Sequence, residues 1–221
     1  MIPLRSSERH YTPATVTLLV IVANVIVFLY ELSLGSGYRL NHFIQVYGIV
    51  PDRLRAATIL TSMFIHGGFL HILGNMWFLW IFGRGVEDLL GHVKFLVFYL
   101  ACGVAAGVVH VLVNAHSPVP TVGASGAIAG VMGGYLIKFP RARIVTLVPI
   151  FFFLTTLDIP AAFLLLYWFA MQFFNGVGSV GYSQASAGDV AWFAHVGGFL
   201  AGIGLMLLMG PRQARYYQPW Q

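Results

Sequence analysis

The sequence predicts an all-α polytopic membrane protein built as a bundle of six transmembrane helices. Composition is the first observation, because 58% of the 221 residues are hydrophobic and only 9% are charged. A soluble domain carries about a quarter charged residues. The second observation is that short charged clusters separate apolar runs of roughly the 20 residues needed to cross a bilayer. The third is that proline and glycine divide the longest uncharged run.

The first half of the chain contains two predicted spans. Residues 11–30 carry no charge and form the first span. Residues 31–55 are too polar to cross a membrane and are expected to form a loop with short interfacial helices. Residues 56–83 contain the second span, which is expected to begin near Gly68.

The second half contains four more. Residues 95–137 are uncharged and too long for one span, and Ser117-Pro118-Val119-Pro120 breaks them, because proline lacks a backbone donor and disfavours helix before it. This places the third span at residues 95–115 and the fourth at 125–138. Residues 144–176 hold the fifth, most of it from residue 159 onward. Residues 178–188 form a glycine- and serine-rich loop, and residues 190–209 form the sixth span.

The distribution of basic residues predicts the orientation. With six spans both termini lie on one side, and nine of the twelve basic residues fall there, namely Arg5, Arg9, Arg84, Lys94, Lys138, Arg141, Arg143, Arg212 and Arg215. Positive residues favour the cytoplasmic side. We therefore expect one membrane domain over residues 1–221: a cytoplasmic segment (1–10), a six-span core (11–210) and a cytoplasmic tail (211–221), in a bacterial-type plasma membrane. The clusters of basic residues set the orientation of the chain in the membrane, so no nucleic-acid partner is expected.

Four polar residues stand out inside the predicted spans, where polar groups are costly and usually functional. They are His71, Asn75, Ser125 and His195. His71, Ser125 and His195 lie 13 to 15 residues from the inner ends of their spans, which is roughly 20 Å at 1.5 Å per residue. Asn75 lies one turn deeper on the same helix face as His71. Three helices thus place polar groups at a common depth, about 10 Å below the outer surface of a bilayer core about 30 Å thick.

The segment Gly123-Ala124-Ser125-Gly126 places the serine at the first turn of a helix that is short for a span. The loop before it must then dip into the membrane, which irregular backbone tolerates only beside protein or water. We expect a water-filled hollow with Ser125 at its floor. The free N–H groups of a helix start favour an oxyanion. Glycines at four-residue spacing let two helices approach closely, which predicts contact between the fourth and sixth spans through Gly126, Gly130, Gly134, Gly198 and Gly202.

This arrangement predicts a catalytic dyad. A serine hydroxyl becomes a good nucleophile when a base removes its proton. Burial disfavours the charged imidazole, so His195 would stay neutral and able to accept that proton. Asp189 and Asp158 fall near the ends of their spans and not at this depth. We expect no cofactor and no metal, because His71 and His195 lack a third ligand at suitable spacing.

These motifs resemble the rhomboid family of intramembrane serine proteases. The resemblance covers residues 60–202 and is carried by His71-x-x-x-Asn75, Gly123-Ala124-Ser125-Gly126 and Ala194-His195-Val196-Gly197-Gly198. It implies that Ser125 is the nucleophile and His195 the base, and that His71 and Asn75 help the Ser125 backbone N–H to hold the oxyanion. Glu87 matches a structural acid of the family.

The resemblance also implies partners. The family cuts transmembrane proteins near their outer end, within membrane lipid, with the loop before the last span as a cap and the fifth span as a lateral gate. Two features differ from some members: Ala57-Thr58 replaces a Trp-Arg pair, and Ala129 replaces a tyrosine that stacks on the base. Trp192 is a candidate to orient His195 because it is near in sequence. The sequence carries no signal for an oligomeric state.

Several alternatives compete with this interpretation. Ser125 could simply allow close helix packing, and His71 with Asn75 could be a structural pair. A histidine-lined transporter would show inverted repeats or a membrane-embedded acid, and the chain shows no repeat. A non-proteolytic rhomboid relative that binds membrane proteins should lack the serine or the histidine, and both are present.

Overall fold

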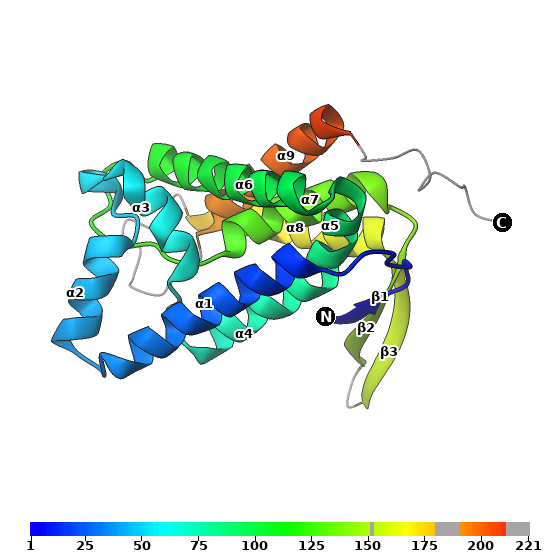
Figure 1. Cartoon of the computed structure of the whole chain (residues 1–221), viewed down its shortest axis with the longest axis horizontal. Coiled ribbons are helices and arrows are strands. Elements are labelled where there is room, and N and C mark those ends of the chain that lie inside the picture. Colours follow the sequence, from blue (N-terminus) through cyan, green and yellow to red (C-terminus); the bar gives the residue numbers. More distant parts are fainter. Residues whose placement is uncertain (151–152, 180–190, 211–221) are drawn as a thin grey trace.

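A bundle of helices with a small sheet at one end makes up the protein (Figure 1). The computed structural model describes residues 1–150, 153–179 and 191–210. The predicted outward loop (178–188) lies outside the described residues from residue 180 on, and so does the predicted tail (211–221). The helical membrane bundle expected from composition is confirmed, with a sheet in addition.

The helices follow the chain in an order that matches the predicted spans. They are α1 (Thr15–Ser33), α2 (Tyr38–Tyr47), α3 (Ala56–Thr61), α4 (Phe69–Phe78), α5 (Arg84–Leu90), α6 (His92–Val113), α7 (Ser125–Lys138), α8 (Ala161–Ser179) and α9 (Trp192–Met209). One short 3₁₀ turn, η1 (Pro51–Arg53), precedes α3, and another, η2 (Ser62–Phe64), follows it. A π-helical stretch, η3 (Leu79–Gly83), joins α4 to α5.

Among the described residues, four helices are long and apolar enough to cross a membrane: α1, α6, α8 and α9. A fifth span arises where the segment Ala56–Phe64 meets Phe69–Leu90 at a bend of 90°. Its long arm begins at Phe69, as predicted, and continues beyond Gly83 to Leu90. The 14 residues of α7 cover only about 21 Å as a helix. The predicted count of six therefore depends on counting α7 as a short span.

Two buried acids fix the start of α1. The first N–H groups of a helix have no partner within the helix, and α1 has no capping side chain of its own. Instead the fully buried Glu87 carboxylate accepts hydrogen bonds from the backbone N–H groups of Val16 (2.7 Å) and Thr17 (2.8 Å). Asp88 accepts from the backbone and the hydroxyl of Thr12, at 2.8 and 2.6 Å. Two side chains of α5 (Arg84–Leu90) thereby hold α1 in place.

The core lies where α6, α7 and α9 pack against one another. Large aromatic side chains fill it: Phe95, Phe98 and Tyr99 of α6, Tyr135 of α7 and Phe199 of α9 are fully or almost fully buried. The Tyr135 hydroxyl donates a hydrogen bond to the carboxylate of Glu8, so the N-terminal segment is tied to the inner end of α7. Close packing of this kind leaves little freedom for the relative positions of the three helices.

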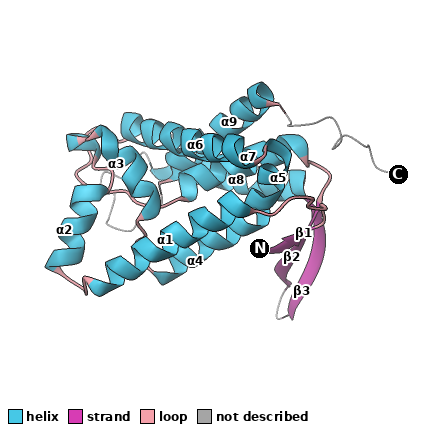
Figure 2. Cartoon of the chain, in the orientation of Figure 1, coloured by secondary structure: helices cyan, strands magenta, loops and turns pink. Residues whose placement is uncertain are grey.

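A three-stranded antiparallel sheet, in the order β1-β2-β3, projects from one end of the bundle (Figure 2). Its strands are β1 (Ile2–Ser6), β2 (Arg143–Ile150) and β3 (Phe153–Pro160). This sheet differs from the prediction, in which residues 1–10 form a plain cytoplasmic segment and residues 144–158 belong to the region of the fifth span. The β-branched run of β2 favours a strand, and α8 begins at Ala161, close to the predicted residue 159.

The sheet is attached to the bundle by its inner end. Ile144 and Thr146 of β2 are fully buried. The Trp77 ring N–H of α4 donates to the backbone oxygen of Pro3 at 2.6 Å, and the backbone N–H of Ala161 donates to Ala142 at 2.8 Å. The sheet therefore sits between α4 and the start of α8.

Candidate active site

Ser125 is the first residue of α7, as predicted, and its side chain is half-buried. The chain reaches it through Gly123, whose φ of +129° is a conformation that L side chains rarely adopt. The Gly123 N–H donates to the backbone oxygen of Ser62 at 2.9 Å. The N–H groups that open a helix have no acceptor in the preceding turn, and those of α7 start beside the serine hydroxyl.

The contact between α7 and α9 is made through glycine, as the spacing predicted. A Cβ atom added at Gly198 would overlap the carbonyl oxygen of Gly126, and one added at Gly202 would overlap that of Gly130. The third glycine differs: Gly133, rather than Gly134, lies against the α9 backbone, at Phe199. Gly134 instead faces the side chains of Phe98 and Met206. The two backbones are therefore in direct contact near Ser125.

This contact brings Ser125 and His195 together. The hydroxyl oxygen of Ser125 lies 2.8 Å from Nε2 of His195, a hydrogen-bond distance. His195 is 8% exposed. The pairing joins residues 70 positions apart, on two helices whose separation is set by backbone contact. A neutral imidazole in this position can accept the serine proton.

Gln172 of α8 completes the surroundings of the imidazole, and sequence reasoning missed it. Its amide oxygen lies 2.7 Å from Nδ1 of His195, and the side chain is buried. Trp168, one turn earlier on α8, places its ring 5.7 Å from the imidazole at 35°. Trp192, the sequence candidate for orienting His195, instead lies near Gly176. A test for polar residues within apolar spans would have found Gln172.

His71 of α4 lies beside the chain that leads to Ser125. A Cβ atom added at Gly123 would sit 2.8 Å from Nε2 of His71. The Gly67 backbone N–H donates to Nδ1 of His71 at 3.3 Å. Because Nδ1 is then the acceptor, neutral His71 carries its proton on Nε2. This donor is directed to the segment that precedes the serine.

A second histidine and a buried acid hold His71 in turn. The rings of His66 and His71 meet edge to face with centroids 5.1 Å apart. The backbone N–H of His66 donates to both carboxylate oxygens of Glu31, at 3.1 and 3.3 Å, and Glu31 is almost fully buried at the end of α1.

Asn75 lies one turn below His71 on α4, as the sequence spacing predicted. It is 7% exposed. Its side-chain nitrogen is buried without a hydrogen-bond partner in the described part of the chain. A buried donor without an acceptor costs about 1–3 kcal/mol, so such an amide is poised for an acceptor that arrives with a ligand.

The loop before α7 is held by the first loop of the protein. Ile49 and Thr121 exchange backbone hydrogen bonds of 3.0 and 2.8 Å. The Thr121 hydroxyl also lies 2.8 Å from Nε2 of His110 in α6. These contacts fix the loop before α7. This is the loop that the short length of α7 predicts to enter the membrane.

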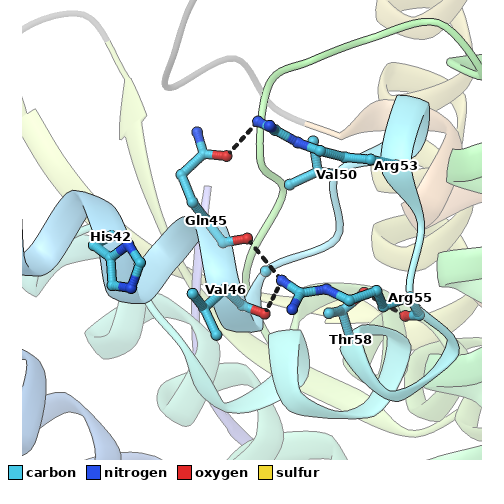
Figure 3. Close-up of a pocket in the computed structure, with 8 residues that line it drawn as sticks. His42, Gln45, Val46, Val50, Arg53, Arg55 and Thr58 are labelled. Carbon is cyan, nitrogen blue, oxygen red and sulfur yellow. Dashed lines mark hydrogen bonds between the residues drawn. The ribbon is translucent and has the colours of Figure 1, made fainter.

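A cavity lies elsewhere, next to the first loop. It has a volume of about 450 Å³ and is lined by residues of α2, η1 and α3, including His42, Gln45, Arg53 and Arg55 (Figure 3). Arg53 donates to the Gln45 side chain at 2.8 Å, and Arg55 to the backbone oxygen of Val46 at 2.7 Å. The cavity does not include Ser125. The water-filled hollow at Ser125 stays a prediction.

Residues 53–212 match the Rhomboid domain family. The chain belongs to the rhomboid family. The matched residues include all three sequence motifs. The family match and the apolar helices together identify an integral, multi-pass membrane protein. The resemblance inferred from the motifs is thereby confirmed at the level of the family.

Curated rhomboid relatives share part of the chain. The Rhomboid protease GluP of Bacillus subtilis is 30% identical over 145 residues, which are 60% of this chain and 28% of the relative. The human presenilin-associated rhomboid-like protein, mitochondrial, is 30% identical over 61% of this chain and 36% of its own length. The chloroplastic rhomboid-like protein 11 of Arabidopsis thaliana is 37% identical over 49% and 40%. The matched stretches thus cover less than half of each relative.

Proposed function

We propose that this rhomboid protein is an intramembrane serine endopeptidase that cuts transmembrane segments of other membrane proteins. The single observation that carries the proposal is the 2.8 Å distance between Ser125 Oγ and His195 Nε2. A non-proteolytic relative has no need for a serine paired with a buried imidazole. The membership of the family and the name of the Bacillus relative support the same activity.

The proposed chemistry has two steps. The Ser125 oxygen attacks the peptide carbonyl carbon while its proton passes to Nε2 of His195. The imidazolium then gives that proton to the leaving amine, and an acyl ester on Ser125 remains. In the second step His195 takes a proton from water, whose oxygen attacks the ester carbon. The bond from that carbon to Ser125 Oγ then breaks, the imidazolium returns the proton to Oγ, and the new carboxyl end is released. No cofactor or metal takes part in this scheme.

The oxyanion would be held by three donors. The Ser125 backbone N–H at the start of α7 is one, and the His71 Nε2–H and the Asn75 amide are the others. The acceptor role of His71 Nδ1 toward Gly67 supports the second donor. The unpartnered nitrogen of Asn75 supports the third. Donors fixed where charge develops stabilise an acyl-transfer transition state strongly.

The predicted depth of Ser125 places the cut near the outward-facing end of the substrate. The orientation follows from the basic residues, which favour cytoplasmic N- and C-termini, and a bacterial-type plasma membrane is the proposed location. Glu87 supports the site indirectly, since it fixes α1. In this proposal the transmembrane substrate enters the site from the surrounding membrane lipid.

Cleavage of a reporter tests this function. The protein would be purified, reconstituted into liposomes and mixed with a reporter protein that has one transmembrane helix. We expect wild type to cut it near its outward end and Ser125→Ala to leave it intact. Ser33→Ala, at an exposed serine at the end of α1, is the matched control and should cut like wild type. Cutting by Ser125→Ala would overturn the proposal, and a cut far from the outward end would overturn the depth.

A further inference from the structure

Gln172 and Trp168 of α8 hold the His195 ring from two directions. They lie one helical turn apart and so share a face of α8. The Gln172 oxygen lies 2.7 Å from Nδ1, and the Trp168 ring packs against the imidazole at a tilt of 35°, with ring centroids 5.7 Å apart. Gln172 and His195 are both buried. A buried polar pair of this kind fixes both partners.

The hydrogen bond decides which imidazole nitrogen carries the proton. An amide oxygen only accepts, so Nδ1 of His195 must donate to Gln172. In a neutral ring Nε2 then has a free lone pair, and this nitrogen is the one that lies 2.8 Å from the serine oxygen. With the proton on Nε2 instead, the imidazole could not accept a proton from Ser125. The amide oxygen therefore selects the form that can act as a base.

From this geometry we infer that Gln172 is the positioning residue of the site: it holds His195 in the tautomer protonated on Nδ1 and in the orientation that meets Ser125. This inference rests on the proposed function, because it assigns to a neutral amide the task that a carboxylate performs in a serine–histidine–aspartate triad. In the described part of the chain no carboxylate bonds the ring. A neutral acceptor avoids the cost of a buried charge at this depth.

The tautomer and orientation of His195 then depend on the position of α8. Ser125, His195 and Gln172 lie on α7, α9 and α8, so one hydrogen-bonded chain crosses three helices. The α7 and α9 backbones are in direct contact, whereas α8 meets α9 through side chains such as Phe169 on Phe199, with ring centroids 4.8 Å apart. A shift of α8 away from α9 would release the ring without moving the serine helix.

Two variants separate an acceptor from a packing residue. Gln172→Met keeps the length and removes the acceptor, whereas Gln172→Glu keeps an acceptor and adds a charge. Gln45→Met makes the same change in the first loop, where the amide accepts from Arg53, and is the matched control. The readout is the second-order rate at which a fluorophosphonate labels Ser125, measured over a range of pH. The ¹⁵N spectrum of the His195 ring reports the tautomer directly.

We expect Gln172→Met to label at least about tenfold more slowly, but to lose less than the roughly 10⁴-fold that a wrong tautomer costs in a serine–histidine triad. Gln172→Glu should label within about threefold of wild type at its optimum, and its acid limb should move to higher pH, because a carboxylate stabilises the imidazolium. The two titratable groups on other helices that interact electrostatically with His195, namely His71 of α4 and His110 of α6, remain unchanged in both variants. Gln45→Met should behave like wild type.

The outcomes are distinguishable from failure of the proposed function. If wild type is not labelled, or is labelled away from Ser125, the protease proposal fails. If wild type is labelled on Ser125 and Gln172→Met labels equally fast, only the role of Gln172 is overturned. If Gln172→Met does not fold, the ring spectrum of wild type decides: a proton on Nε2 of neutral His195 overturns the inference, and a proton on Nδ1 supports it.

Discussion

Gly198 of α9 lies directly against the carbonyl oxygen of Gly126 in α7, with no space for a side chain between the two backbones. Gly202 and Gly130 repeat the contact one turn deeper. Small residues at four-residue spacing allow this approach. The contact between Gly198 and Gly126 fixes the distance between His195 and Ser125. His195 lies within one helical turn of Gly198, and Ser125 immediately precedes Gly126.

Enlarging Gly198 should separate the two proposed catalytic side chains. We expect Gly198→Ala to destabilise the protein by about 1–3 kcal/mol, as overpacking does, and to slow substrate cleavage. Thermal unfolding and reporter cleavage would measure the two effects. Gly204→Ala on the same helix is the control, since an added Cβ there has nothing within 4 Å. Equal behaviour of the two variants would show that the close contact is unimportant.

Removing an oxyanion donor should affect the chemical step. His71→Ala and Asn75→Ala are each expected to lower kcat by about 10²–10³-fold, the usual cost of one such donor, with little change in KM. Steady-state kinetics with the reporter would separate the two constants. His42→Ala, in the first-loop cavity, should leave kcat unchanged. A rise in KM with normal kcat would assign His71 and Asn75 to binding.

Loss of the Glu87 carboxylate should weaken the fold. Glu87→Gln leaves a single oxygen and brings an N–H₂ group toward the backbone N–H groups of α1. Since the side chain is fully buried, we expect a loss of about 1–3 kcal/mol in the free energy of unfolding. Asp52→Asn, whose exposed ion pair with Arg53 spans 3.7 Å, should change stability by less than about 0.5 kcal/mol. Comparable losses in both variants would contradict a special role for Glu87.

His10 predicts a pH dependence of stability. Burial, and next the positive charge of Arg84, hold the pKa of His10 below its usual 6.5, although Glu8 and Asp88 act in the opposite direction. The unfolded chain therefore binds a proton at this residue before the folded one does. Stability should fall as the pH drops below about 6.5 and stop falling below the lowered pKa.

The variant His10→Gln isolates that contribution. The melting temperatures of wild type and His10→Gln would be followed from about pH 7.5 to about pH 5. As the pH drops, the melting temperature of wild type should fall relative to that of His10→Gln. A constant difference across that range would mean that His10 does not titrate differently in the folded state.

Much of the fold is predictable from where charge stops an apolar run. Lys138 ends α7, and Gly68 immediately precedes α4, as expected. The meeting of Ser125 with His195 followed from their common depth and from the glycine spacing. These predictions succeeded because burial in lipid restricts where polar groups and helix ends can lie.

The sheet and Gln172 were not predicted, for different physical reasons. β1 pairs with β2, about 140 residues later in the chain. A local pattern in a short polar N-terminal segment does not indicate a strand partner so far away in the sequence. Residues 144–158 are apolar enough to pass for part of a span, although their β-branched side chains favour a strand. Gln172 has a single amide whose partner lies on another helix, so its role depends on packing that the sequence does not show.

The most direct test of the central claim is the position at which a fluorophosphonate attaches. Mass spectrometry of the labelled, reconstituted protein should find the adduct on Ser125 alone. Replacing His195 with glutamine should abolish the adduct while the protein stays folded. An adduct on another serine, or equal labelling of Ser125 without the imidazole, would contradict the account.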